Sequence, residues 1–411
     1  MIAIISGFIT SFAGFWPTSV FYAYKIGGIP ARDILDCFVL CLSCLSYFIF
    51  FPKGEDRDFK KSLFLFLLPM GVSLGFHSFF FLVPKLGNEQ VYIERTFSRS
   101  AHILILSVSV MIQSSFMQTK RYAKLYLRGH YTFLILLMLV GVWQWLSFYR
   151  DVPFPVTEAR TFHHSVGEGQ SFLFAQRLTS FCIEPSFFAP YIIEFIILSQ
   201  GKFILFTLLG LFHLIFNFSM AAYAHFGLLM FGYGITFLWK KKIPKIALIF
   251  ISILILGPFL YPQGLIILFK PIAVRLEGFL NIEEHARLYI LVQVFQNFLQ
   301  SNGLNIIFGN GIASFTNLKE TVGALPSGEK IHDSSNTLLI DSLFELGLFG
   351  VLSHLLFLKS LFPPLKGYSK GWIYALFILG ATFYRGDYVS FRFWQSLLVL
   401  YFLRSHDKKS I

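Results

Sequence analysis

The stretch I-H-D-S-S-N-T-L-L-I-D-S-L-F-E-L-G-L-F-G, residues 331–350, joins a polar loop to a run of apolar residues. The loop part carries His332, and the apolar part begins at Thr337 and continues to about residue 358. A helix needs about 20 mostly apolar residues to cross a bilayer, and this run has that length. We therefore expect the chemistry to take place where this loop meets the lipid, and the remaining chain to hold the loop there.

The composition of the whole chain indicates an integral membrane protein. Of the 411 residues, 55% are hydrophobic and only 14% are charged, which is more apolar than a soluble domain needs for its core. The formal net charge of +12 would suggest a nucleic-acid partner in a soluble protein, but here the basic residues gather in short segments between apolar runs. We expect one all-α polytopic domain over residues 1–411, with membrane lipid around it and no nucleic-acid partner.

Uncharged apolar runs predict about twelve transmembrane helices. The runs lie near residues 2–20, 34–51, 62–84, 101–118, 131–149, 185–200, 203–218, 222–239, 246–262, 337–358, 372–383 and 392–403. The basic segments after the second, fourth and eighth runs, and the C-terminal tail, fall on one side of such a bundle. Cytoplasmic loops carry an excess of Lys and Arg, so we expect both termini in the cytoplasm. The outer loops are then residues 150–178 and 263–335, the larger containing short helices.

The first candidate site is A-Q-R-L-T-S-F-C-I-E-P-S-F-F-A-P, residues 175–190, at the expected outer end of the sixth span. It places Arg177, Glu184 and Pro185 close together along the chain. Proline suits the first turn of a helix, and a carboxylate just before it suits the positive end of the helix dipole. The segment is therefore either a capped helix start with an interfacial arginine, or a site at which that arginine binds an anion.

The larger outer loop contains the second candidate. Residues 282–300 carry four Gln and Asn side chains at i, i+3, i+4 and i+7 from residue 293, which predicts a helix with a polar stripe. Arg287 falls roughly 130° from the centre of this stripe, on the apolar side, where an arginine needs an anionic partner. The turn G-N-G, Gly309 to Gly311, permits a tight bend with exposed backbone N–H groups but matches no nucleotide-binding pattern. The alternative is an ordinary loop turn.

The third candidate is His332, with Asp333 and Asn336 beside it at the mouth of the tenth span. A neutral histidine can accept a proton from a sugar hydroxyl, and a charged one can bind phosphate. The alternative is a solvated loop histidine. Asp341 and Glu345 follow at i and i+4 inside the span, where charged side chains face the bundle interior or a water-filled cavity. They either line a path for a polar substrate or form hydrogen bonds within the bundle.

No pattern of metal ligands accompanies these residues. His163 and His164 lie in the other expected outer loop, without the H-E-x-x-H or carboxylate spacing of a metal site. Cys37, Cys41 and Cys44 share one face of a helix, where we expect them to be small packing residues. We therefore expect neither a metal nor a cofactor.

Taken together, these motifs resemble the O-antigen polymerase and ligase superfamily. The resemblance rests on R-L-T-S-F-C-I-E-P-S-F-F-A at residues 177–189, on H-A-R-L-Y around Arg287, on the G-N-G turn, and on H-D-S-S-N-T-L-L followed by E-L-G-L-F-G at residues 345–350. The order, the spacing and the shared outer location of these motifs carry it. Members of this superfamily handle undecaprenyl-diphosphate-linked glycans at the outer face of the cytoplasmic membrane. The resemblance therefore implies a bacterial inner-membrane protein whose active site faces the periplasm.

The resemblance implies a metal-independent glycosyltransferase with a lipid-diphosphate donor. Its catalytic residues would be His332, which serves the acceptor, and Arg177 and Arg287, which hold the diphosphate. The expected substrate-binding set is completed by Glu184, Asn336, Gly309, Gly311 and Asp341, with Glu184 as the partner of an arginine. A flippase and a chain-length regulator are the protein partners that such an enzyme implies.

Two alternatives to a polymerase stay open at this point. A ligase would pass the finished polymer to lipid A core, but ligases often carry asparagine directly after the histidine, where this chain has Asp333. The E-P-S motif and the small loops also favour the polymerase. A glycan-lipid flippase or secondary transporter would have a similar number of spans. The long outer loop, and the absence of Gly- or Pro-broken helices at matching positions in two halves, argue against it.

Overall fold

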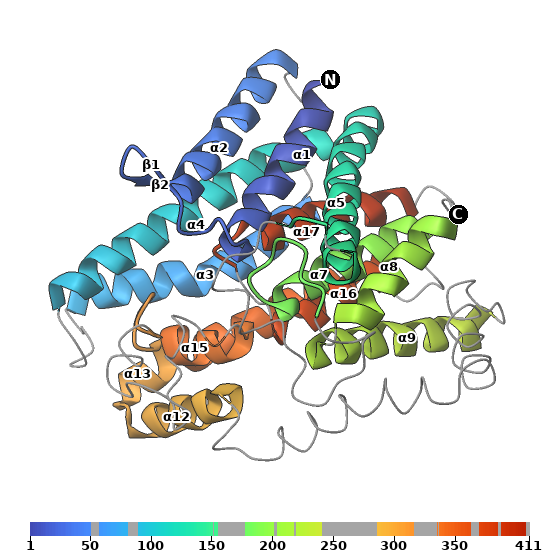
Figure 1. Ribbon diagram of the computed structural model, residues 1–411. Coiled ribbons are helices and arrows are strands. Elements are labelled where there is room, and N and C mark those ends of the chain that lie inside the picture. Colours follow the sequence, from blue (N-terminus) through green and yellow to red (C-terminus); the bar gives the residue numbers. More distant parts are fainter. Residues whose placement is uncertain are drawn as a thin grey trace.

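The computed structural model describes residues 1–50, 57–80, 89–150, 152–154, 177–200, 204–217, 219–240, 286–315, 335, 337–362, 370–384 and 388–407. These residues are mostly helical, as the sequence predicts (Figure 1). His332 and Asn336, the apolar run at 246–262 and most of both expected outer loops lie outside the described residues.

Thirteen α-helices occur in the described part of the chain. They are α1 (Ile2–Phe15), α2 (Ala31–Phe50), α3 (Arg57–Phe80), α4 (Glu89–Met117), α5 (Lys120–Tyr149), α7 (Pro185–Ser199), α8 (Ile204–Asn217), α9 (Met220–Lys240), α12 (Ala286–Gln300), α13 (Gly303–Phe308), α15 (Leu338–Leu361), α16 (Lys370–Thr382) and α17 (Phe391–Asp407). A short 3-10 helix, η1 (Trp16–Thr18), follows α1. Strands β1 (Lys25–Ile26) and β2 (Ile29–Pro30) pair antiparallel before α2.

Four of the described helices are long and apolar enough to cross a membrane. They cover Arg57–Ser78, Ile93–Met117, Lys120–Phe148 and Leu338–Leu361. Shorter apolar helices occur at Ile2–Thr18, Pro185–Ser199, Ile204–Asn217 and Met220–Ile235. Length and composition therefore indicate an all-α membrane protein, and a count of twelve spans stays a prediction.

Helix α1 packs so closely against α5 that only glycine fits at their contact. A Cβ atom on Gly7 would lie 2.1 Å from the carbonyl oxygen of Tyr126, and one on Gly129 would lie 1.9 Å from that of Ile4. Small residues let helix backbones approach in this way inside membranes, where packing replaces the hydrophobic effect as the main attraction. The other end of α1 meets α17, since a Cβ on Gly14 would lie 2.5 Å from the backbone nitrogen of Arg392.

The helix ends gather at two ends of the bundle. At one end, α1 and α5 begin side by side, Lys370 at the start of α16 reaches the end of α7, and Arg404 near the end of α17 reaches the end of α15. We call this the basic end. At the opposite end, α7, α15 and α17 begin; Ile183 donates to Thr18 after α1, and Thr337 donates to Phe383 after α16. We call this the loop end.

One predicted loop is helical instead. The sequence analysis placed the basic stretch from residue 120 in a loop before a span at residues 131–149, but α5 begins at Lys120 and includes both. The stretch contains Ala, Leu, Lys and Arg, which are good helix formers, and no proline interrupts it. Its 30 residues extend about 45 Å, longer than the bilayer core of about 30 Å.

Candidate functional site

Helix α15 is interrupted where the G-N-G turn meets it. Gly347 has φ 66° and ψ −163° within the helix, and Gly309 in the turn has φ 78°. Side chains disfavour this left-handed region, which glycine enters freely. The two glycines also face each other closely: a Cβ on Gly309 would lie 2.2 Å from the carbonyl oxygen of Glu345, and one on Gly347 would lie 2.5 Å from the nitrogen of Gly309. The predicted span near residues 337–358 is present as α15. The interruption at Gly347 is a feature that the apolar pattern did not predict.

The turn donates hydrogen bonds to the carbonyl groups that lose their helical partners at the interruption. Asn310 donates its backbone N–H to the Phe344 oxygen at 2.9 Å, and Gly311 donates to the Glu345 oxygen at 3.0 Å. In a regular helix these oxygens would accept from residues four positions further on. The G-N-G sequence permits exposed N–H groups, but the backbone N–H groups of Asn310 and Gly311 are bonded to α15. Gly309 and Gly311 dock a loop onto α15.

A charged cluster lies directly beside the interruption. The Glu345 side chain is 1% exposed, and its Oε1 accepts from Arg99 of α4 at 3.0 Å. Tyr388, just before α17, donates to the other carboxylate oxygen at 2.9 Å and accepts from Arg99 at 2.9 Å. Buried charges are tolerated when they are paired and hydrogen-bonded in this way. Three segments far apart in sequence thus meet at one carboxylate, and we call this the Glu345 cluster.

Asp341 lies one turn before Glu345 and fastens the segment that follows His332. Its side chain is buried, and Oδ1 accepts the backbone N–H of Ser335 at 2.8 Å. Ser335 in turn accepts from the N–H of Thr337 at 3.1 Å. Asp341 therefore positions Ser335, which lies three residues after His332. The contact seen for Asp341 is thus with the protein backbone.

Helix α12 carries Arg287 against the same helix. The structure describes it from Ala286 to Gln300, within the predicted helix at 282–300, and residues 282–285 lie outside the described residues. Ile290 and Val294 pack in one cluster with Phe344 of α15. Arg287 thus belongs to a helix that lies beside α15, as Figure 1 shows for α12, α13 and α15. The conformation of the Arg287 side chain lies outside the described atoms.

Arg177 and Glu184 lie at the loop end through a separate set of contacts. Helix α7 starts at Pro185 with Glu184 as its N-cap residue, as the sequence predicts. The Glu184 carboxylate accepts from Ser186 at 3.0 Å, and Arg177 donates Nε–H to the carbonyl oxygen of Asn217 at 3.4 Å. The Arg177 contact connects the segment before α7 to the end of α8, and the Glu184 contact is local to the start of α7. Both the arginine and the carboxylate are only partly buried.

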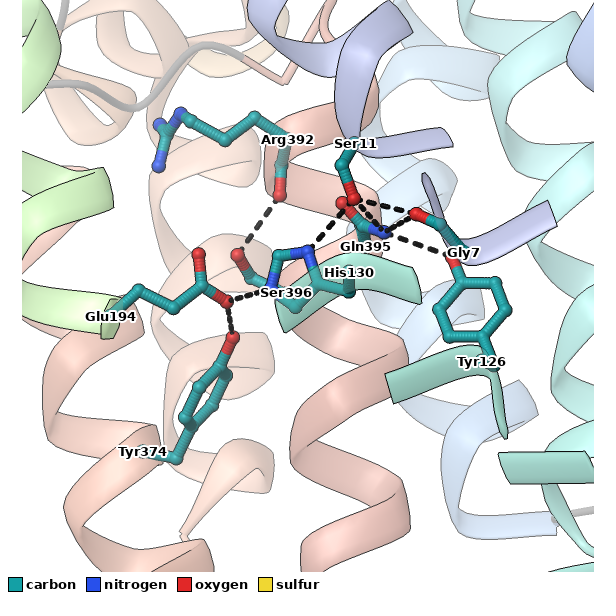
Figure 2. A network of polar contacts seen from close by, with 9 residues as sticks. All are labelled: Gly7, Ser11, Tyr126, His130, Glu194, Tyr374, Arg392, Gln395 and Ser396. Atoms are coloured by element: carbon teal, nitrogen blue, oxygen red, sulfur yellow. Dashed lines mark hydrogen bonds and ion pairs between the residues drawn. The ribbon is translucent and has the colours of Figure 1, made fainter. Parts of the chain in front are cut away.

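A second polar cluster lies inside the bundle (Figure 2). Nε2 of His130 is 2.9 Å from Oε1 of Glu194, and each side chain is 3% exposed. Tyr374 of α16 donates its hydroxyl to the same oxygen, and Nδ1 of His130 contacts the Ser11 hydroxyl at 2.9 Å. Helices α1, α5, α7 and α16 are joined by this group, which we call the Glu194 cluster.

The hydrogen bonds continue from Ser11 to further helices. Gln395 of α17 donates to the Ser11 hydroxyl at 3.0 Å and to the Tyr126 hydroxyl at 3.1 Å, and Tyr126 donates to Gln113 of α4 at 3.1 Å. Gln113 donates to Ser43 of α2 at 2.9 Å. Polar side chains between membrane helices hold the helices together and fix their rotation. This chain of contacts does so at one level of the bundle.

The sequence predicted hydrogen bonds within the bundle as one of two interpretations for Glu345, but it indicated neither Arg99 nor Tyr388 as a partner, and the Glu194 cluster was not predicted. Arg99 fell in a short segment between two predicted spans, and His130 fell in the stretch assigned to a loop. Glu194 was the available signal, because an isolated carboxylate inside an apolar helix faces the bundle interior and needs a partner. Its partners could not be named from the sequence, since His130 lies 64 positions away and Tyr374 lies 180.

The described residues contain no group of three or more His, Cys, Asp or Glu side chains that could hold a metal ion. The arrangement of apolar helices and buried polar contacts defines the class of the chain as an all-α membrane protein. Comparison of the chain with protein-family models, with curated proteins and with solved structures gave no match in any of the three.

Proposed function

We propose that this chain is a polysaccharide polymerase of the inner membrane. It transfers a growing surface glycan, such as O-antigen, from undecaprenyl diphosphate onto a new lipid-linked repeat unit at the periplasmic face. A flippase that delivers the repeat units and a chain-length regulator are the partners that this reaction calls for. Under this proposal, Arg177, Arg287 and His332 act together at one end of the bundle.

The observation that carries the proposal is the bond from Ser335 to Asp341. It fastens the segment after His332 to the start of α15, at the loop end where Arg177 and Glu184 also lie. The turn Gly309–Gly311 brings the α12 segment to the same helix. Both motif-bearing parts of the larger outer loop are thus attached to α15 within two turns of its start.

The reaction follows from the expected roles of these residues. The oxygen of an acceptor sugar hydroxyl attacks the anomeric carbon at the reducing end of the growing chain, and the bond from that carbon to the diphosphate oxygen breaks. The electron pair leaves with undecaprenyl diphosphate, and the hydroxyl proton passes to His332. Arg177 and Arg287 bind the diphosphate, and they bind it more strongly as negative charge develops on the leaving group.

The test is the glycan profile of the source cell, read as a ladder on a gel. The gene is deleted and then complemented with the wild type, with His332→Ala, or with His163→Ala as a matched control in the other predicted outer loop. We expect deletion and His332→Ala to leave core with a single repeat unit, and His163→Ala to restore the ladder. The amount of each variant in the membrane is measured in parallel.

Two other outcomes would replace the proposal. Bare core, with polymer still held on the lipid carrier, would identify a ligase. Repeat units trapped on the cytoplasmic side would identify a flippase. If deletion left the ladder unchanged, the chain would take no part in the synthesis of this glycan.

The interruption at Gly347 is the one observation that favours a transporter, because broken helices form the substrate sites of many carriers. In those sites the freed backbone groups line a cavity. Here the freed carbonyl groups of Phe344 and Glu345 accept from the turn at Asn310 and Gly311. The carbonyl groups at the break therefore bind the protein's own backbone, and we keep the polymerase as the proposed function.

A further inference from the structure

A cavity of about 170 Å³ opens at the basic end of the bundle. Its apolar walls come from three helices, and the one charged residue of its lining is Lys370, the first residue of α16. The lining residues are Leu127, Tyr131, Ile197, Leu198, Lys370 and Leu403. A single water molecule takes about 30 Å³ of liquid, so the cavity has room for a segment of a larger apolar ligand.

Basic side chains accompany this cavity on α5 and α16. Lys124, Leu127, Arg128 and Tyr131 follow each other at i, i+3, i+4 and i+7, so they share the face of α5 that lines it. Lys124, Arg128 and Lys370 are all exposed. Lys370 uses one donor on the carbonyl oxygen of Gln200 at 3.2 Å, and an ammonium group has three. None of the six lining residues is acidic.

The tyrosine in the cavity wall is already held by the protein. The Tyr131 hydroxyl is 2.8 Å from the Ser199 hydroxyl, at the end of α7. The floor of the cavity therefore presents the ring of Tyr131 together with aliphatic side chains. A ligand that fits must combine an apolar chain with an anionic group at the level of the helix ends.

We propose that this cavity binds an anionic phospholipid of the membrane leaflet at the basic end. One acyl chain lies against Leu127, Ile197 and Leu403, and the phosphate lies among Lys370, Arg128 and Lys124. Basic pockets between membrane helices bind anionic head groups by this combination of charge and apolar contact. The site is distinct from Arg177 and from the Ser335–Asp341 contact, which lie at the loop end, and it does not depend on the transferase proposal.

The experiment measures lipid retained by the full chain, purified in a neutral detergent and titrated with phosphatidylglycerol or phosphatidylcholine in native mass spectrometry. The test variant is Lys370→Gln with Arg128→Gln. The control is Lys61→Gln with Lys359→Gln, which removes the same charge from exposed positions on α3 and α15 at the basic end. Thermal unfolding of each variant confirms that it folds.

We expect the wild type and the control to retain phosphatidylglycerol over phosphatidylcholine. The test variant should bind phosphatidylglycerol about thirtyfold more weakly, which corresponds to two basic residues near a membrane surface. A second variant, Leu403→Trp, fills the cavity while it leaves every charge in place, and it should also lose the lipid. A general attraction of basic surfaces for anionic lipid would not respond to it.

Three results would overturn the proposal. Equal losses in the test and control variants would mean that only net charge matters. Full retention by Leu403→Trp would place the lipid elsewhere. Retention of a polyprenyl phosphate with no preference for phosphatidylglycerol would assign the cavity to a different ligand.

Discussion

Replacement of Gly347 by alanine tests whether the G-N-G turn and the break in α15 form one unit. An alanine at φ 66° costs about 1–2 kcal/mol from backbone sterics alone. Its Cβ would also lie 2.5 Å from the Gly309 nitrogen and 2.5 Å from the Ile307 oxygen. Both are backbone atoms, so no side-chain rotation relieves the overlap and the turn must move away.

Movement of the turn breaks two backbone hydrogen bonds, those that the N–H groups of Asn310 and Gly311 donate to α15. Each contributes about 0.5–1.5 kcal/mol. With the backbone term, Gly347→Ala should lower the free energy of unfolding by about 2–5 kcal/mol. The measurement is unfolding of the purified chain in mixed micelles of increasing denaturing-detergent content, followed by circular dichroism.

The matched control is Gly75→Ala in α3, the helix that packs along α15. A Cβ there would meet nothing within 4 Å, and alanine favours a helix over glycine by roughly 0.5–1 kcal/mol. The control should therefore be neutral or slightly stabilising. The double variant Gly309→Ala with Gly347→Ala should lose much less than the sum of the single losses, because both release the same contact. Additive losses, or a stable Gly347→Ala, would refute a joint unit.

Three further predictions concern the buried polar groups. Glu194→Leu leaves two buried donors, on His130 and Tyr374, without their acceptor, and it should lower the free energy of unfolding by about 1–3 kcal/mol for each donor. Glu194→Gln keeps an oxygen at this position, so its free energy of unfolding should fall less in the same micelle titration. Arg99→Leu leaves Glu345 as an unpaired buried charge and should lower the free energy of unfolding by about 3–5 kcal/mol. The double variant Arg99→Leu with Glu345→Leu should recover part of that loss. A larger loss in the double variant would contradict the pairing of the two side chains. Asp341→Ala should collapse the glycan ladder at normal protein levels and Asp341→Asn, which can still accept from Ser335, should retain part of it; an intact ladder in Asp341→Ala would remove its positioning role.

Helix positions could be predicted because they follow from local sequence. Apolar runs located α7, α8 and α17 to within a few residues, and the Glu184–Pro185 pair marked the start of α7. The same rule failed at α5, because a charged stretch can continue a helix beyond the lipid when its residues favour helix.

Contacts between distant segments could not be predicted in the same way. The Glu345 cluster joins residues 246 and 43 positions from the carboxylate, and no local pattern relates Arg99 or Tyr388 to it. The break at Gly347 was hidden for a related reason. A single glycine in an apolar run is compatible with a continuous helix, and only the approach of Gly309 requires the left-handed backbone there.

Helix α15 is long and apolar enough to cross a bilayer, and the break gives it a second role. Because Phe344 and Glu345 turn their carbonyl oxygens to the G-N-G turn, the segment that contains α12 and α13 is attached to α15 by backbone bonds, whatever the side chains nearby. The Glu345 carboxylate, on the same residue, is held by Arg99 of α4. A shift of α4 relative to α15 would therefore be transmitted through one residue to the segment that contains α12 and α13. In the proposed polymerase, the distance between Arg287 and the segment that follows His332 would then depend on the packing of α4. Arg99→Lys should therefore shift the length distribution of the glycan ladder while polymer is still made.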